Sequence, residues 1–137
     1  MAQFHHTFSD PFSSEEVDLG YVDGGQLKQV FREFAWEEWL QKMEDSAIDD
    51  FHFSPTLNVF QKEQKREMLL SALKDKGKLI FYVSYRRPQK VKRLFGLMER
   101  FEEKYTTEVL DQTKEQAAQL LQAFIEGDAA YLNEKVK

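Results

Sequence analysis

The chain has 137 residues, no cysteine, 42% hydrophobic residues, 14% aromatic residues and a formal net charge of −5 at pH 7. This length and apolar content predict one compact domain and argue against intrinsic disorder, while the lack of cysteine excludes disulfides, cysteine nucleophiles and thiolate metal sites. No apolar run is long enough to cross a bilayer and the N-terminus lacks the pattern of a signal peptide, so we expect a cytoplasmic protein without a membrane partner.

The N-terminal part, residues 1–24, is expected to be an arm that packs on a helical body of residues 25–137, with the whole chain 1–137 forming a single domain. Glycines at positions 20, 24 and 25 indicate a joint between the arm and the body. Within the arm, residues 3–8 have the character of a short strand. Ser13 and Glu16 have the spacing of a capping box that opens a short helix.

The first long helix is expected over residues 25–46, and its apolar residues fall on two opposite sides. One side carries Leu27, Val30, Phe31 and Phe34, and the other carries Trp36, Trp39, Leu40 and Met43. Three interpretations stay open: the helix is buried on both sides, it bends near Ala35, or one side faces a partner.

A second helix is expected to start at Ser54 and Pro55, an N-cap followed by a favoured first helical residue, and to end at Gly77. Residues 78–85 (KLIFYVSY) are the one strong strand signal, because they are rich in β-branched and aromatic residues. A lone strand cannot satisfy its backbone hydrogen bonds, so this strand needs a partner, for which residues 4–8 are the candidate.

Pro88 is expected to start a third helix, whose apolar stripe should lie in the core. The stripe consists of Val91, Leu94, Phe95, Met98, Phe101 and Tyr105. Thr113 and Gln116 have capping-box spacing and predict a helix that ends at Gly127, and Asp128 is a cap for a short terminal helix.

Together these elements predict a mainly α fold. It is a single compact domain of four to five helices with one short strand or hairpin near residues 78–85. The alternative is an α+β fold with a small antiparallel sheet.

Charge is divided along the chain: the net charge is −9 over residues 1–60, +7 over residues 61–105 and −3 over residues 106–137. Such asymmetry indicates recognition of charged partners, and the first two segments are expected to lie close together in the fold. The acidic, aromatic stretch 33–53 predicts a surface for a basic protein partner, unless its tryptophans belong to the core. Its candidate contact residues are Trp36, Trp39, Glu37, Glu38, Asp49 and Asp50.

A basic run over residues 86–93 is the second candidate site. Its cations can hold phosphates while a neighbouring aromatic ring stacks on a base. The candidate nucleic-acid-binding residues are Arg86, Arg87, Lys90, Lys92 and Arg93. A solvated surface, paired with acids of the first 60 residues, is the alternative, and we rank nucleic acid below a protein partner because the whole protein is acidic.

No pattern predicts catalysis, a metal site or a cofactor. The histidines, His5, His6 and His52, have no metal-ligand spacing, and the glycines form no phosphate-binding motif. The sequence therefore predicts a non-catalytic cytosolic protein-binding domain, most concretely an acidic inhibitor or immunity-type protein that neutralises a basic partner. A second copy of the chain is a further candidate partner. The alternative function is a nucleic-acid-associated accessory protein that uses residues 86–93. A third, lower-ranked function is a small enzyme or ligand-binding domain with a pocket among the aromatic residues.

Overall fold

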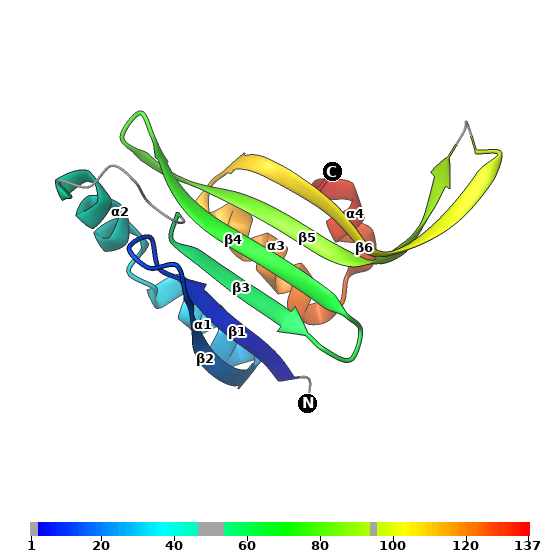
Figure 1. Cartoon of the computed structure of the whole chain (residues 1–137), viewed down its shortest axis with the longest axis horizontal. Helices are drawn as coiled ribbons and strands as arrows, with labels where there is room; N and C mark the ends of the chain where they lie inside the picture. The colour runs from blue at the N-terminus through cyan, green and yellow to red at the C-terminus, as the bar shows by residue number, and fades with distance from the viewer. Residues whose placement is uncertain (1–2, 47–53, 94–95) are drawn as a thin grey trace.

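Six antiparallel strands form one sheet in the order β2-β1-β3-β4-β5-β6, in a computed structural model that describes residues 3–46, 54–93 and 96–137 (Figure 1). The strands are β1 (Gln3–Ser9), β2 (Glu16–Asp23), β3 (Thr56–Gln61), β4 (Arg66–Asp75), β5 (Lys78–Arg93) and β6 (Met98–Gln112). The helices are α1 (Gly24–Glu33), α2 (Trp36–Asp45), α3 (Lys114–Glu126) and α4 (Ala129–Lys135).

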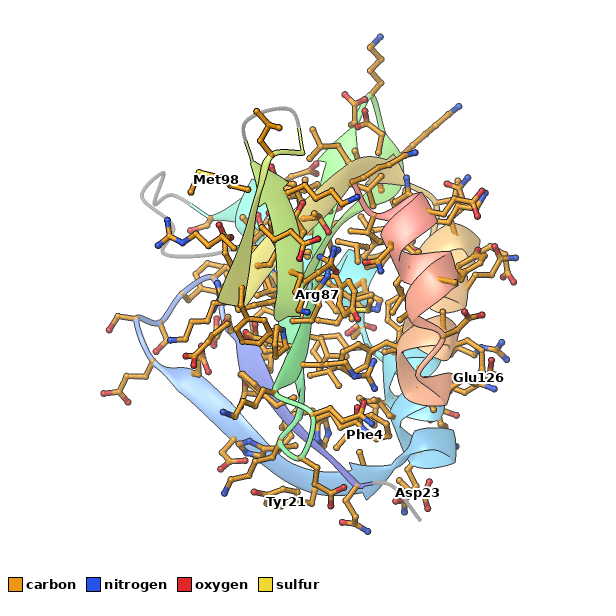
Figure 2. The ribbon with its side chains drawn as sticks, turned by 90° about the vertical axis from the view of Figure 1, so that its right-hand side faces the viewer. Phe4, Tyr21, Asp23, Arg87, Met98 and Glu126 are labelled. Atoms are coloured by element: carbon orange, nitrogen blue, oxygen red, sulfur yellow. The ribbon has the colours of Figure 1, made fainter. Side chains whose placement is uncertain are left out.

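The hydrophobic core lies between the sheet and the helices, and the other face of the sheet is open (Figure 2). Alternate strand residues point into this core, as the pleat of a strand requires. Phe4 of β1, for example, points toward α3, where its ring centre lies 5.9 Å from that of Phe124. The buried strand residues of the core are Phe4, Leu57, Val59, Met68, Leu70, Ala72, Phe81, Val83 and Tyr85.

The expectation of a mainly α, helical protein is wrong, because a six-stranded antiparallel sheet dominates the fold. The α+β alternative is closer, although the sheet is large rather than small. The N-terminal segment supplies two of its strands, with β1 paired between β2 and β3. The helix expected after Ser13 is not present among the described residues, since Glu16 begins β2.

The hairpin of β3 and β4 replaces the helix expected between Pro55 and Gly77. Apolar residues here repeat every second position, which buries Met68, Leu70 and Ala72 on one face. Lys76 and Gly77 form the two-residue turn from β4 to β5, both with the positive φ that a type I′ hairpin requires. Gly77 therefore turns a hairpin rather than ending a helix.

The strand expected over residues 78–85 is present as the first half of β5, and it pairs with β4 and β6 rather than with β1. Pairing with β4 ends at Arg86, so beyond this point β5 and β6 form a two-stranded hairpin that extends past the rest of the sheet (Figure 1). From here on, the arm means this hairpin, whose described residues are 87–93 and 96–105, and not the N-terminal arm expected over residues 1–24. This hairpin replaces the helix expected from Pro88, which lies instead where the register between β5 and β6 shifts.

Two helices expected from local signals are confirmed. The side chain of Thr113 accepts a hydrogen bond from the backbone N–H of Gln116 at 3.1 Å, and Gln116 returns a bond to the backbone of Thr113, which completes the capping box of α3. Gly127 ends α3 in the left-handed conformation, with φ of 73°, and Asp128 caps α4.

The expected first helix is broken into α1 and α2 by an extended backbone at Phe34, next to the position at which a bend was one of the interpretations. The break turns the second apolar stripe back toward the protein. Phe8 of β1 and Phe12 cover the ring of Trp39, with ring centres 5.1 Å and 6.3 Å away, so the N-terminal segment packs against this stripe.

Candidate ligand-binding site

The open face of the sheet carries a cleft of about 680 Å³, near the β3–β4 turn and the base of the arm. This volume lies within the range of sites that hold small organic ligands. Residues from β1 to β6 line it: His5, Tyr21, Phe60, Gln61, Lys62, Lys65, Arg66, Glu67, Arg86, Glu103 and Lys104.

Three aromatic rings lie side by side on one wall of the cleft. Sheet register pairs His5 of β1 with Tyr21 of β2 and with Phe60 of β3, so three adjacent strands present one ring each. The His5 ring stacks on Tyr21, with centres 4.9 Å apart and planes 27° apart, and lies 5.9 Å from Phe60. Tyr21 is largely exposed, which leaves a ring face open to a ligand.

Asp18 fixes the His5 ring in this row. The Nε2 atom of His5 donates a hydrogen bond of 2.8 Å to the carboxylate of Asp18, and the backbone N–H of Gly20 donates another of 2.8 Å to the same oxygen. These two hydrogen bonds, chiefly the one from Gly20, lower the pKa of Asp18. The carboxylate therefore stays ionised and holds His5 against Tyr21.

The opposite walls of the cleft are basic. Lys62 and Lys65 come from the β3–β4 turn, Arg86 from β5 and Lys104 from β6. Within the part of the chain that the structure describes, no carboxylate forms an ion pair with Lys62, Lys65 or Lys104. Three exposed ammonium groups thus line the cleft without a close ion-pair partner among the described residues, and with Arg66 and Arg86 they outnumber the two carboxylates of the lining, Glu67 and Glu103, which favours an anionic ligand.

Two acids, Glu67 and Glu103, lie among the cations of this cleft, and Glu67 is the one that is ion-paired with Arg86. Its carboxylate lies 3.6 Å from the guanidinium of Arg86, which also donates to the hydroxyl of Thr106 at 3.1 Å. Burial raises the pKa of Glu67 even though the charge of Arg86 opposes the shift. The pair holds Arg86 at the wall of the cleft, and Glu67 weakens the positive field that an anion would meet.

The open face of the sheet is polar where β1, β3 and β4 lie side by side, near the start of β3. Small hydroxyl and amide side chains from β1, β3 and β4 are buried there and bond to one another: Thr56 lies 2.7 Å from Ser71, and Asn58 donates to Ser9 at 3.3 Å. A smaller cleft of about 320 Å³, with Tyr82 and Leu69 among its lining residues, lies beyond them. This face therefore offers hydrogen bonds beside the apolar and aromatic lining of the two clefts.

The expected basic site is divided by the fold. Arg86 lines the cleft, whereas Lys90 and Lys92 are exposed on the arm, and Arg93 is the last residue of β5. Arg87 is only 5% exposed and points toward α4, where its guanidinium donates to Asn133 at 2.6 Å (Figure 2). Its pKa is lowered, mainly by burial. Arg87 therefore ties the arm to the helical layer.

The expected acidic site is divided in the same way. Trp36 is 1% exposed, and its indole N–H donates to the carbonyl of Phe31 at 3.0 Å, so this ring lies in the core. Trp39 is half-buried, and the ammonium of Lys42 lies 4.6 Å from its ring centre. Glu37 and Glu38 are exposed on α2. Asp49 and Asp50 lie outside the described residues.

Most of the cleft was not foreseen from the sequence. Phe60, Lys62 and Lys65 were assigned to a helix, and Tyr21 to a joint. For Phe60 the sequence does contain a signal. The apolar residues Leu57 and Val59 alternate with polar residues, which indicates a strand and places Phe60 on the face opposite to the core.

Among the described residues, no three His, Asp or Glu side chains are arranged to hold a metal ion. The histidine His6 is buried, and its Nδ1 atom donates to the carbonyl of Gly20 at 2.8 Å. No described helix has the length and apolar character needed to span a membrane. Comparisons with protein-family models, with curated proteins and with solved structures find no match for this chain.

Proposed function

We propose that this is a non-catalytic binding protein whose cleft takes an anionic ligand with a flat aromatic ring. The chemistry is that of a nucleotide, either free or as one unit of a single-stranded nucleic acid. The observation that carries the proposal is one cleft of about 680 Å³ that is lined by a row of three rings and by three ammonium groups, none of which has a close ion-pair partner among the described residues.

The aromatic wall supports a ring-bearing ligand. A planar ring that stacks on an exposed aromatic side chain gains about 1–3 kcal/mol per base in single-strand binding proteins. Tyr21 offers such a face, and it is already oriented by its stack on His5. Because the carboxylate of Asp18 already holds His5, little side-chain freedom is lost when the ligand binds.

The basic walls support a negative group on the same ligand. Lys62 and Lys65 reach the cleft from a turn, and Lys104 reaches it from the strand on the far side. A phosphate between them would meet ammonium groups from two directions, as single-strand binding grooves provide along a backbone. Arg86, held by Glu67, adds a planar donor.

Calorimetric titration with adenosine 5′-monophosphate, adenosine, inorganic phosphate and a short single-stranded oligonucleotide tests the proposal. We expect the monophosphate to bind more tightly than adenosine or phosphate alone, because ring and anion each contribute. Equal affinity of the free nucleotide and the oligonucleotide identifies a mononucleotide ligand, and a tighter oligonucleotide identifies a nucleic acid. Absence of binding by all four probes contradicts the proposal.

Variants separate the two contributions. Tyr21→Ala should weaken the monophosphate and adenosine by about 5- to 150-fold, which corresponds to about 1–3 kcal/mol of lost stacking. Lys65→Gln should weaken the monophosphate and leave adenosine unchanged. Lys76→Gln is the matched control, because Lys76 is also exposed in a hairpin turn with positive φ, 50° against 54° for Lys65, and does not line the cleft.

One observation favours a second candidate function, the binding of a basic protein partner. Glu37 and Glu38 are exposed in the first turn of α2, beside the half-buried ring of Trp39. A basic partner would be steered by these acids and anchored on the ring. Binding of a lysine-rich probe peptide should then fall in the double variant Glu37→Gln/Glu38→Gln and persist in Glu134→Gln, on the other side of the protein's helical layer.

A further inference from the structure

The arm exposes apolar side chains at its tip. Leu97 is 85% exposed and Phe101 is 59% exposed, and Met98 is exposed beside them. Sheet register places Lys90 directly opposite Phe101, so an ammonium group lies next to an exposed ring. Exposed apolar residues grouped at a protruding tip indicate an interaction surface, and the neighbouring cations indicate that its partner is acidic.

A second exposed surface lies at the opposite edge of the sheet. β2 pairs only with β1, so one side of its backbone has no strand partner among the described residues. Val17 is 48% exposed, and Leu19 is exposed as well. Glu16, Asp18 and Asp23 give this strand three negative charges, and it contains no lysine or arginine. The strand is an apolar and acidic counterpart of the apolar and basic arm.

These two surfaces cannot meet within one chain. The arm continues β5 and β6, and four strands separate β6 from β2 in the sheet. The base of the arm and β2 line the same cleft, but the tip of the arm, at Met98, projects away from Tyr21 of β2 (Figure 2). The exposed tip is therefore directed away from the β2 edge of its own chain.

We infer that the occupant of each surface is a second copy of this chain, with the arm of one copy bound along the β2 edge of the next. Opposite charges would set the pairing, and the apolar groups Leu97, Phe101 and Val17 would be buried by it. An unpaired strand edge is a template for another strand. The β5 strand of the arm has no acid over residues 87–93, whereas its β6 strand carries both signs, so the acids of β2 select the β5 edge of the arm over a like edge. The arm and β2 also contribute Lys104 and Tyr21 to the ligand cleft, so the variants that test this contact are placed at positions outside the cleft.

A heterologous contact has a distinctive test, because each copy contributes two different surfaces. The arm variant Lys90→Glu/Phe101→Ser removes the basic and apolar features of the arm. The edge variant Val17→Lys/Leu19→Lys removes the apolar features of β2 and adds positive charge. All four positions are exposed, so circular dichroism and thermal unfolding should show both variants folded. None of these residues lines the cleft.

Sedimentation equilibrium then measures the mass of each species against concentration and salt. We expect the unmodified chain to self-associate with rising concentration and to do so less at high salt, and each variant alone to be monomeric. An equimolar mixture of the two variants should form a one-to-one dimer, because the arm of the edge variant still meets the intact edge of the arm variant.

Other outcomes overturn the inference. An unmodified chain that stays monomeric up to near-millimolar concentration has no such contact. Self-association by the edge variant alone shows that arms pair with arms, and self-association by the arm variant alone shows that edges pair with edges. Variants that are each monomeric but do not combine show that the two surfaces do not bind one another.

Discussion

Replacement of Arg87 by Met should destabilise the fold by about 2–4 kcal/mol. The substitution keeps a long unbranched stem and removes a guanidinium that is buried without a carboxylate partner. That group donates to the Tyr85 carbonyl at 3.1 Å, Thr107 at 2.6 Å, Asn133 at 2.6 Å and Gln89 at 3.0 Å, and it lies 4.4 Å and 4.7 Å from the rings of Tyr85 and Tyr105.

The magnitude follows from what each partner loses. The carbonyl of the buried residue Tyr85 loses a hydrogen bond from a charged donor, at a cost of about 1.5–3 kcal/mol. The two cation–π contacts add about 0.5–2 kcal/mol each. Asn133 and Thr107 are less buried and can bond to water, so they add little. Removing a charge from a poorly solvated position returns part of this loss, because burial of an ion is itself unfavourable.

Urea denaturation followed by tryptophan fluorescence measures the change, with an unchanged m-value as the criterion for comparing midpoints. Arg87→Lys should lose nearly as much stability as Arg87→Met, because an ammonium has no planar fork to reach several acceptors at once. Asn133→Ala combined with Arg87→Met should show non-additive losses. A loss below about 1 kcal/mol for Arg87→Met would refute the role of Arg87 in joining the arm to α4.

Three further predictions concern single positions. The Glu67→Gln variant should gain stability relative to the unmodified chain as pH rises from about 3 to 7. The raised pKa of Glu67 means that its ionisation is less favourable in the folded state than in the unfolded state, so the unmodified chain loses stability over this range. Chemical denaturation at several pH values measures the difference in unfolding free energy, and a difference that does not change with pH contradicts the prediction. The same variant should bind anionic probes more tightly. Gly24→Ala should lower the unfolding free energy by about 1–3 kcal/mol, since its Cβ would lie 2.5 Å from the Cγ2 of Ile125, a branched side chain with little freedom to move. Thr113→Ala should cost about 1 kcal/mol in chemical denaturation through loss of the capping box, and Thr113→Ser should restore most of it.

The parts of the fold that the sequence predicted are those with a complete local signal. The helix α3 has a capping box at Thr113, an apolar face and a glycine at its end, and each of these features acts within a few residues. Residues 78–85 predicted a strand because β-branched and aromatic side chains are crowded there. Neither prediction depended on knowing what the segment packs against.

The prediction of a helix between Ser54 and Gly77 was wrong because the turn between β3 and β4 lacks the residue types that usually mark a turn. The chain reverses at residues 62–65 (KEQK), which include no Gly, Pro, Asn or Asp, and Lys65 adopts a φ of 54°. Without a visible turn, two short strands looked like one helix that began at Ser54. The alternation of apolar residues was present, but a helical repeat of Met68, Leu69, Ala72 and Leu73 competed with it.

The prediction of a helix from Pro88 was wrong for a different reason. Its apolar residues are spaced as on an amphipathic helix, yet Met98 and Phe101 are exposed on a hairpin. The assumption that an apolar stripe faces the core fails where a segment leaves the body of the protein. Gly96, with φ of 87°, was the local signal for a turn in the middle of the supposed helix. Leu94 and Phe95 lie outside the described residues.

The cleft could not be assembled from sequence because its residues come from strands that are distant in the chain. Tyr21, His5 and Phe60 form one row only after the order β2-β1-β3 and its register are known. A shift of one residue in either pairing would send one of these rings to the helical face. Of the basic run, Arg86 lines the cleft, whereas its neighbour Arg87 points the other way, and the nucleic-acid-binding role expected of both stays a prediction.

The overall acidity of the protein was the main argument against a nucleotide-like ligand, and the sheet order weakens it. The acidic strand β2 and the basic arm occupy opposite ends of the strand order. Among the described residues, one ion pair joins a base of residues 61–105 to an acid of residues 1–60, that of Lys74 with Glu44 at 3.0 Å. Distant charges are screened, because the Debye length is about 8 Å at physiological salt, so the acids nearest the cleft, Glu67, Glu103 and Glu16, matter more than the net charge of the protein. An anion that approaches Lys62, Lys65 and Lys104 therefore meets the local field of those groups, and the net charge of −5 has little influence on it.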